Sequence, residues 1–493
     1  MRYTKMNRRE FLWRIVRHKP GQPLATSSGL DPYRPDQPLS QEDALHLLRR
    51  TTFGVSRTDL DRAVRMTPGQ AVAALFSNTS APTPPRWATV DPTTESFPSA
   101  DARLQEYNRR YAELQQWWLQ LMISDGFSIR EKLVFFWHNH YCSDYLKVYY
   151  PQYMYLQNQT FRQMAWGNVR ELARAMVADP AMLIYLDNVV SIKGNPNENF
   201  ARELLELFTL GVNNYTEHDI VEAARALTGW RIRGMRGVFN PQLWDPGIKE
   251  FLGQRGAFNA DDIIRIIFEQ EQAARFIATK IYRTFVYDVP NPDIVEQLTQ
   301  ILRSNNFELR PMLEVLLTSE HFFDQQLRGA VIKSPIDFMV GMCRQLNFTQ
   351  LPLSYGVERM AKLTLELLFP PTVEGWKGHH LWINTNTYPL RERIAEYFIE
   401  GKRNDNFQNF PAAPDVRAFA QSFESSSSAR DFVRDVARFL LPLEPGQKTQ
   451  QYLLDALLLG APEYEWSLSM PNVELRIRSL LKAIMTLPEY QLL

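Results

Sequence analysis

Apolar side chains recur at the three- and four-residue spacing of amphipathic helices along most of the chain. This spacing predicts helices at 101–124, 128–141, 151–178, 196–210 and 216–228. Further on it predicts helices at 260–286, 292–304, 310–323, 334–347, 356–368 and 388–400. We therefore predict an all-α protein whose main part is a multi-helix bundle.

Two stretches interrupt the helical pattern. Residues 77–100 are dense in Pro, Thr and Ser and lack apolar periodicity, which indicates a loop over the surface. Residues 230–259 are Gly-rich and aperiodic, and Gly237-Val238-Phe239 within them could form part of a small hairpin. We therefore expect an irregular excursion within the main helical domain.

The chain of 493 residues is longer than the usual ~100 to 200 residues of one domain. We divide it into an N-terminal arm at 1–39, a main helical domain at 40–401 and a small C-terminal helical module at 402–493. The last boundary follows the polar, proline-containing residues 402–413. The module has helical spacing near 414–423, 428–440, 448–458 and 471–486.

The N-terminal arm contains a sequence, Asn-Arg-Arg-Glu-Phe-Leu at 7–12, that is similar to a twin-arginine export signal. A cleavable signal also needs ~7 to 15 apolar residues, but Arg14, Arg17 and Pro20 occupy that stretch. No segment approaches the ~20 apolar residues that cross a bilayer. We therefore expect a cytoplasmic protein with no transmembrane segment. The alternative is export, or association with the cell envelope, through a partner.

Charge, cysteine and aromatic content exclude some classes of protein and favour others. Lys plus Arg and Asp plus Glu both total 55, so no basic field favours nucleic acid. Two cysteines, Cys142 and Cys343, are too few for a disulfide framework or a zinc cluster of cysteines. We expect two free thiols, although one long-range disulfide would also fit. An aromatic content of 12% suits a core of packed helices.

Two histidines near the end of the predicted helix at 128–141 are candidate metal ligands. Neutral imidazole nitrogens bind zinc, iron, copper or nickel, which suggests His138 and His140. On a continuous helix, however, residues i and i+2 point ~200° apart. They can share one ion only if the helix ends or the segment is extended there. Otherwise one or both are core histidines bonded to neighbouring carboxylates or carbonyls.

The predicted helix at 196–210 carries two candidate acids. Asn195 is expected to cap it, with Pro196 as its first residue and Glu198 reaching back to the cap. Glu203 and Glu206 lie one turn apart on a polar stripe. If the stripe faces a buried pocket, the two carboxylates could bind a cation or do acid–base work. The alternative is an ordinary solvated face.

The remaining candidate functional residues are a third carboxylate and the residues of an aromatic loop. Asp187 follows a predicted helix and could join the acids or simply end that helix. The segment around 375–387 combines paired aromatic rings, paired imidazoles and amides, a composition found in ligand-binding loops. Its candidate ligand contacts are Trp376, His379, His380 and Trp382. A packed loop that plugs the bundle is the alternative.

These residues define one hypothetical site. Its catalytic groups would be His138, His140, Glu203, Glu206 and Asp187. A divalent metal is possible, with His138, His140 and Glu203 as ligands, and any other cofactor is unknown. The chain has no Gly-x-Ser-x-Gly elbow, phosphate loop, dinucleotide fingerprint or His-Glu-x-x-His pair, so the common enzyme motifs are missing.

Several motifs together resemble one family. They lie at 47–54, 136–140, 196–211, 224–230 and 370–376. On these residues the chain resembles the bacterial domain of unknown function 1800 family, which has no agreed activity. The resemblance implies that members are often exported and accompany a sulfatase-like protein of the domain of unknown function 1501 family. Where relatives carry a His-Asp pair, this chain has Trp244-Asp245, which weakens a metal site that needs that histidine.

Two functional hypotheses follow. The first is an accessory or interaction protein that acts beside a sulfatase-like partner, which the missing enzyme motifs and the resemblance favour. The alternative is a metal-dependent or acid–base enzyme with a buried His/Glu pocket in the helical bundle.

Overall fold

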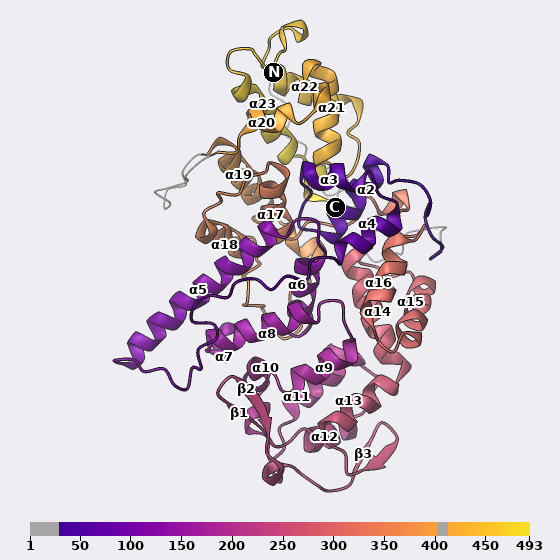
Figure 1. The fold of residues 1–493 in the computed structure, drawn as a ribbon, viewed down its shortest axis with the longest axis vertical. Coiled ribbons are helices and arrows are strands. Elements are labelled where there is room, and N and C mark those ends of the chain that lie inside the picture. Colours follow the sequence, from indigo (N-terminus) through magenta and orange to yellow (C-terminus); the bar gives the residue numbers. More distant parts are fainter. Residues whose placement is uncertain (1–28, 402–412) are drawn as a thin grey trace.

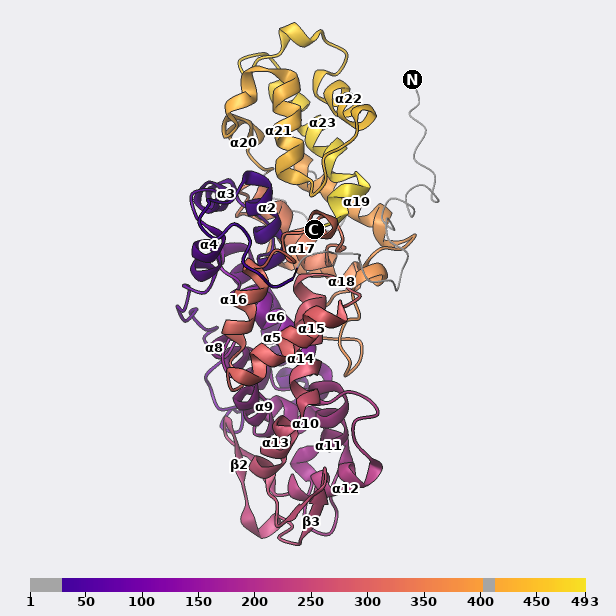
Figure 2. The same cartoon turned by 90° about the vertical axis from the view of Figure 1, so that its right-hand side faces the viewer.

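The computed structural model describes residues 29–401 and 413–493, so the twin-arginine-like sequence at 7–12 lies outside the described residues. Helices dominate, and the described part of the chain has only two small two-stranded sheets. This confirms the predicted all-α class. Figures 1 and 2 show an elongated molecule with helices α20–α23 at one end and the strands at the other.

The first half of the chain forms most of the helices that surround the candidate site. Their bounds are α2 (Gln41–Thr51), α3 (Arg57–Ala63), α4 (Pro68–Leu75), α5 (Ala100–Ser124), α6 (Arg130–His140), α7 (Tyr145–Val148), α8 (Pro151–Gln163), α9 (Val169–Val177), α10 (Pro180–Tyr185), η1 (Asn188–Val190), α11 (Glu198–Glu203), η2 (Leu204–Thr209) and α12 (Glu217–Ala226). The helix predicted at 151–178 is broken between α8 and α9, around Gly167.

The second half adds the remaining helices. They are α13 (Ala260–Glu269), α14 (Glu271–Phe285), α15 (Pro292–Ser304), α16 (Leu309–Thr318), η4 (Gln325–Leu327), α17 (Pro335–Gln345), α18 (Leu353–Lys362), η5 (His379–Trp382), α19 (Thr387–Glu400), α20 (Val416–Gln421), η6 (Glu424–Ser427), α21 (Ala429–Leu440), α22 (Gln447–Leu458), η7 (Glu463–Glu465), α23 (Val473–Met485) and η8 (Pro488–Gln491). The helix predicted at 260–286 is two helices, which meet at Gln270.

The irregular excursion predicted at 230–259 contains the strands. β1 (Trp230–Arg233) and β2 (Arg236–Phe239) form an antiparallel hairpin, followed by η3 (Pro241–Leu243). β3 (Lys249–Phe251) and β4 (Gln254–Gly256) form a second hairpin. Gly237 in β2 approaches the backbone closely, since an added Cβ would lie 2.1 Å from the Ala178 carbonyl oxygen. The predicted hairpin is therefore confirmed.

A continuous hydrophobic core runs through both ends of the molecule. Buried apolar side chains from Leu39 to Leu492 form a single cluster of contacts. The Arg49 guanidinium on α2 donates to the carbonyl oxygens of Arg438 and Phe439 on α21, at 3.1 and 2.9 Å. These bonds satisfy the last carbonyls of α21, which have no partner within their own helix.

Local side-chain chemistry sets the start of α12. Thr216 and Asp219 form a capping box, and Asp219 also accepts a hydrogen bond from the Leu252 amide at 2.7 Å. The start of α11 differs from the prediction. Its cap is Asn197, whose side chain accepts from the Asn199 amide at 2.9 Å, and the Asn195 amide instead closes a turn onto the Ile192 carbonyl.

Two predictions about the whole chain can be compared with the described residues. Cys142 and Cys343 are both free and buried, as expected. Across 29–401 and 413–493, no helix combines the length and the apolar character needed to span a membrane.

Candidate functional site

Helix α6 directs its two histidines to different surroundings. It continues through His140, so His138 and His140 occupy positions i and i+2 of a regular helix. The His138 ring lies edge-on to Trp118, with 5.3 Å between centroids, and 5.9 Å from Trp376. Its buried Nε2 atom has no hydrogen-bond partner, and burial lowers the pKa of His138 to about 3. His138 is therefore a neutral core residue.

His140 is held at both ring nitrogens. Nε2 lies 3.0 Å from the Phe208 carbonyl oxygen, and Nδ1 lies 3.0 Å from the Lys280 Nζ atom. A carbonyl oxygen only accepts hydrogen bonds, so Nε2 carries the hydrogen and Nδ1 accepts from Lys280. Burial, and then the charge of Lys280, hold the pKa of His140 well below its usual range. The ring is therefore neutral, with one tautomer selected.

Asn139, between the two histidines, fixes the loop around Trp376. Its Oδ1 accepts from the Trp376 amide at 2.7 Å, and its Nδ2 donates to the Trp376 carbonyl at 3.3 Å. Gly375 has a φ of +80°, and a Cβ there would lie 2.2 Å from the Asn139 Oδ1 atom. Only glycine allows this approach.

A π-helical turn presents the carbonyl groups of the site. η2 follows α11 directly, and its wider turn ends with the Leu210 amide bonded to the Leu205 carbonyl at 2.8 Å. The last carbonyls of a helix have no partner within it. Here Lys280 donates to the Leu207 carbonyl at 3.0 Å, and His140 donates to that of Phe208. Such turns are rare and occur frequently at functional sites.

Lys280 joins helix α14 to this turn. Besides its bonds to His140 and Leu207, its Nζ atom lies 4.9 Å from the centroid of the Phe276 ring. Burial lowers the pKa of Lys280 to about 8, and nearby Arg283 acts in the same direction. Cys142 and Glu374 act in the opposite direction. An amine with this pKa is partly unprotonated near neutral pH, unlike an ordinary lysine.

Cys142 lies at the edge of the same cluster. Its thiol donates to the Asn139 carbonyl at 3.3 Å. Burial raises the pKa of Cys142 to about 12, so the group is a thiol and not a thiolate. This environment favours a packing role, because the thiolate is the reactive form.

Glu203 on α11 is affected electrostatically by Glu206 on η2 and by Glu374 on the loop, where Glu374 also pairs with Lys377 at 2.7 Å. Glu203 and Glu206 are partly buried, and Glu206 accepts from the Tyr215 hydroxyl at 2.7 Å. Burial raises the pKa of Glu203, and the charges of Glu206 and Glu374 add to this effect. Because Glu374 also acts on Lys280, the stripe belongs to the same electrostatic cluster as Lys280 and His140.

Asp187 is engaged elsewhere. Its carboxylate pairs with Lys147 at 2.8 Å and accepts from the Asn199 side chain at 3.4 Å. Its φ of +59° places it in the left-handed region just after α10. These contacts match the alternative of a polar residue that ends a helix.

The aromatic loop at 375–387 is largely packed against the helical core. Trp376 and Trp382 are buried, and Trp376 stacks on Phe135 with 5.7 Å between centroids. His379 Nε2 lies 3.2 Å from the Asp288 carboxylate, and burial lowers the pKa of His379. His380 is exposed. The four predicted ligand contacts therefore divide between the core and the surface.

The predicted metal set is not assembled. In the described residues, no group of three or more His, Cys, Asp or Glu could hold a metal ion. His138 faces aromatic rings, and both nitrogens of His140 are occupied by Phe208 and Lys280. Asp245, which follows Trp244, pairs with Arg225 at 2.8 Å.

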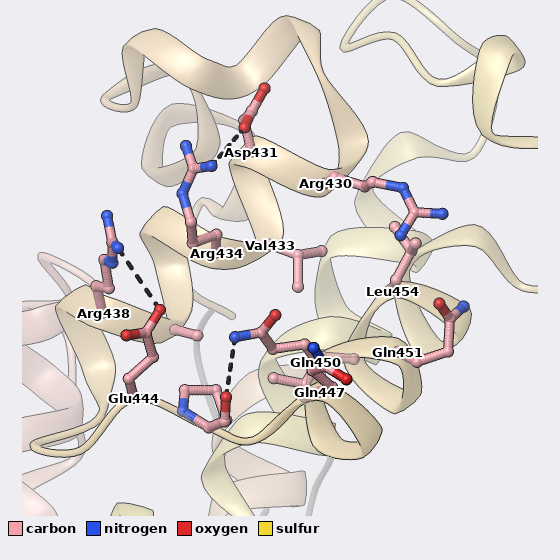
Figure 3. A pocket seen from close by; sticks show the side chains of 13 residues that line it. Arg430, Asp431, Val433, Arg434, Arg438, Glu444, Gln447, Gln450, Gln451 and Leu454 are labelled. Atoms are coloured by element: carbon pink, nitrogen blue, oxygen red, sulfur yellow. Dashed lines mark hydrogen bonds and ion pairs between the residues drawn. The ribbon is translucent and has the colours of Figure 1, made fainter.

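A groove of about 400 Å³ between α21 and α22 is a separate polar feature (Figure 3). Three arginines one turn apart line it, but each is paired with an acid. Arg430 pairs with Glu463, Arg434 with Asp431 and Arg438 with Glu444. The groove therefore offers no uncompensated charge.

Lys280 is the central residue that the sequence pattern did not reveal. The available signal was its position one turn after Phe276, on a helix whose inward face carries Ala273 and Ile277. A lysine beside that apolar face is a candidate for burial. Its partner His140 lies 140 positions earlier in the sequence, beyond the range of any local pattern.

The fold and this cluster define a predominantly helical protein with a buried lysine–histidine pair at a π-helical turn. The chain belongs to the family described as "Protein of unknown function (DUF1800)", whose family model matches residues 46–492. No curated protein matches the chain, and no solved structure does.

Proposed function

We propose that the chain is an acid–base enzyme whose central groups are Lys280 and His140. The observation that carries this proposal is the 3.0 Å contact between Lys280 Nζ and His140 Nδ1. The opposite nitrogen of His140 is fixed by the Phe208 carbonyl, so Nδ1 is oriented to accept a proton from Lys280.

The acidities of the surrounding groups support this role. An acid–base catalyst works best when its pKa lies near the working pH. Burial brings the pKa of Lys280 down to about 8 and raises the pKa of Glu203. Acid–base enzymes use burial and neighbouring charges to raise the pKa of a glutamate or lower that of a lysine toward the working pH.

Substrate screening with variants tests the proposal. Once a substrate is found, Lys280→Met should lower kcat by about 100-fold or more, the usual range for loss of a general acid or base. Lys147→Met is a matched control, because Lys147 forms only a partly exposed ion pair. Full activity in Lys280→Met would overturn the proposal.

We also propose that the chain acts with a partner protein. Leu146, Val190 and Leu381 are 69%, 60% and 63% exposed, which is high for large apolar side chains. The Lys147–Asp187 ion pair brings the segments of Leu146 and Val190 together. Exposed apolar side chains whose segments lie together on the surface, as those of Leu146 and Val190 do, are typical of interfaces. The sulfatase-like identity of the partner comes from the family resemblance alone.

Co-purification of the tagged chain from its native host tests the partner proposal. A stoichiometric sulfatase-like protein should be recovered, and Leu146→Ser with Val190→Ser should weaken its recovery. Absence of any stoichiometric partner would contradict the proposal. Fractionation of the same cells tests our proposed cytoplasmic location against export through the partner.

A further inference from the structure

We propose that the outer face of the β1–β2 hairpin docks an acidic segment of a partner protein. This inference rests on the proposed partner and names the chemistry that the partner presents. The hairpin lies at the end of the molecule opposite α20–α23 (Figure 1), and β1 contacts η1, which carries the exposed Val190.

The register of the hairpin puts three arginines on one face. Residues directly opposite each other in an antiparallel pair share a face, and so do alternate residues of one strand. Arg233 lies opposite Arg236, and Arg231 lies two residues before Arg233 on β1. The other face carries Ile232 and Gly237 and packs against α10. The face of the three arginines, called here the arginine face, is therefore directed outward, and Arg233 and Arg236 are exposed.

The guanidinium groups of the arginine face are not neutralised by carboxylates. Across 29–401 and 413–493, none of the three arginines takes part in an ion pair. Arg231 donates to carbonyl oxygens, among them that of Val189 at 2.6 Å. Asp91 lies beside the turn of the hairpin, but its Oδ1 atom accepts hydrogen bonds from Thr93. One carboxylate cannot balance three guanidinium groups, so the face keeps an excess of positive charge.

The second hairpin provides a contrast. There Glu250 of β3 lies opposite Arg255 of β4, and the two side chains form an ion pair at 3.2 Å. Opposite charges across a strand pair are stabilising, whereas like charges directly opposite each other are destabilising. The juxtaposition of Arg233 and Arg236 therefore carries a repulsion that an anionic ligand would relieve.

The surroundings of the arginine face favour a protein as the source of the anion. The bond from Arg231 to the Val189 carbonyl places the neighbouring Val190, which is 60% exposed, at the edge of this face. An acidic segment with an apolar side chain can contact both, because carboxylates pair with guanidinium groups through two parallel hydrogen bonds. The chain as a whole has equal numbers of acidic and basic residues, which does not favour nucleic acid or an anionic membrane.

Peptide binding to the full chain tests the inference. The probe is a fluorescein-labelled peptide in which glutamates flank one leucine, and its affinity is measured by fluorescence anisotropy at low salt. Arg233→Gln with Arg236→Gln should raise Kd at least about tenfold, because two charge pairs of the interface are lost.

The matched control is Arg255→Gln with Arg265→Gln. It removes the same charge, but from arginines that are already paired within the chain, with Glu250 and Glu269. It should change Kd by less than about twofold, because exposed charges remote from the peptide are screened by salt.

Three results would overturn the docking surface. The first is no binding of the peptide by the wild type, and the second is an affinity that falls no further in the arginine double variant than in the control. The third is a double variant that loses binding of a DNA duplex or of phosphatidylglycerol vesicles but keeps that of the peptide, since the face then recognises another anion.

Co-purification from the native host separates this inference from the proposed partner. If a stoichiometric partner is recovered equally well with the wild type and with the arginine double variant, the partner stands and the arginine face is overturned. If the peptide depends on the two arginines as expected but no stoichiometric partner is recovered, the acidic docking surface stands and the proposed partner is contradicted.

Discussion

His138 and His140 lie two residues apart on one helix, yet they occupy opposite kinds of environment. His138 is enclosed by Trp118, Phe161 and Trp376, and its Nε2 atom has no partner. His140 bonds through both nitrogens to the π-helical turn and to Lys280. A shared motif therefore contains one packing residue and one residue of a polar network.

The difference teaches that burial alone does not identify a functional imidazole. Both rings are buried, and burial lowers the pKa of each. Only His140 contacts a second titratable side chain whose pKa is also shifted, and it does so with a defined tautomer. That coupling, and not the spacing of the histidines, is what favours chemistry at this end of α6.

The largest effect is expected at Gly375, which packs closely against Asn139, the residue between the two histidines. Gly375→Ala should lower the free energy of unfolding by about 3 kcal/mol or more, through overpacking and a left-handed backbone. Gly194→Ala is the matched control, since Gly194 has a φ of +82° and nothing within 4 Å of an added Cβ. It should cost only about 1 kcal/mol. Equal losses in urea unfolding would show that the Asn139 contact is unimportant.

The next effect concerns Lys280 and pH. Its folded pKa of about 8 lies below the ordinary value of about 10.4, so between these values the unfolded chain binds more protons. The cost of burying the cation is fully present below pH 8 and is relieved as pH rises to about 10.4. Over this window the wild type should gain up to about 3 kcal/mol relative to Lys280→Met. Parallel stability curves for the two proteins would contradict the shifted pKa.

A smaller effect is expected at His140. His140→Phe removes the side-chain partner of the Phe208 carbonyl and leaves the Lys280 amine with its bond to the Leu207 carbonyl but without its bond to the imidazole. Loss of one partner of a buried hydrogen bond costs about 1–3 kcal/mol. We expect a loss of about 2 kcal/mol in chemical denaturation. An unchanged free energy of unfolding would contradict this expectation, because it would mean that water takes over the hydrogen bonds of the lost imidazole.

The smallest effect is expected at His138. His138→Phe replaces a ring whose Nε2 atom is unpaired with an apolar ring of similar shape, in aromatic surroundings. The free energy of unfolding should change by less than about 1 kcal/mol, in either direction. A loss as large as that of His140→Phe would remove the contrast between the two histidines.

Local sequence patterns predicted much of the fold and part of the site. Helical periodicity located α5 and α6 to within two residues, and the aperiodic stretch contained the hairpin of β1 and β2. The pairing of Glu203 with Glu206 on one stripe was also predicted, and the two carboxylates are electrostatically coupled. These features depend on neighbours in the sequence.

The features that were not predicted depend on tertiary structure. A single π-helical turn inside a helix has nearly the same apolar pattern as an α-helix, so the sequence did not distinguish η2 from the helix before it. The cap of α11 was placed at Asn195 and not at Asn197, because both asparagines precede the helix and only the turn at Ile192 distinguishes them. Lys280 reaches His140 because α14 packs beside η2, and no local pattern encodes that arrangement.

The account depends most on the state of the Lys280–His140 pair, which nitrogen NMR of the labelled full chain measures directly. The account predicts that Lys280 Nζ titrates near pH 8. It also predicts that His140 stays neutral from pH 5 to 9 with its hydrogen on Nε2. Titration of Lys280 above pH 10, or protonation of His140 near pH 6.5, would contradict it.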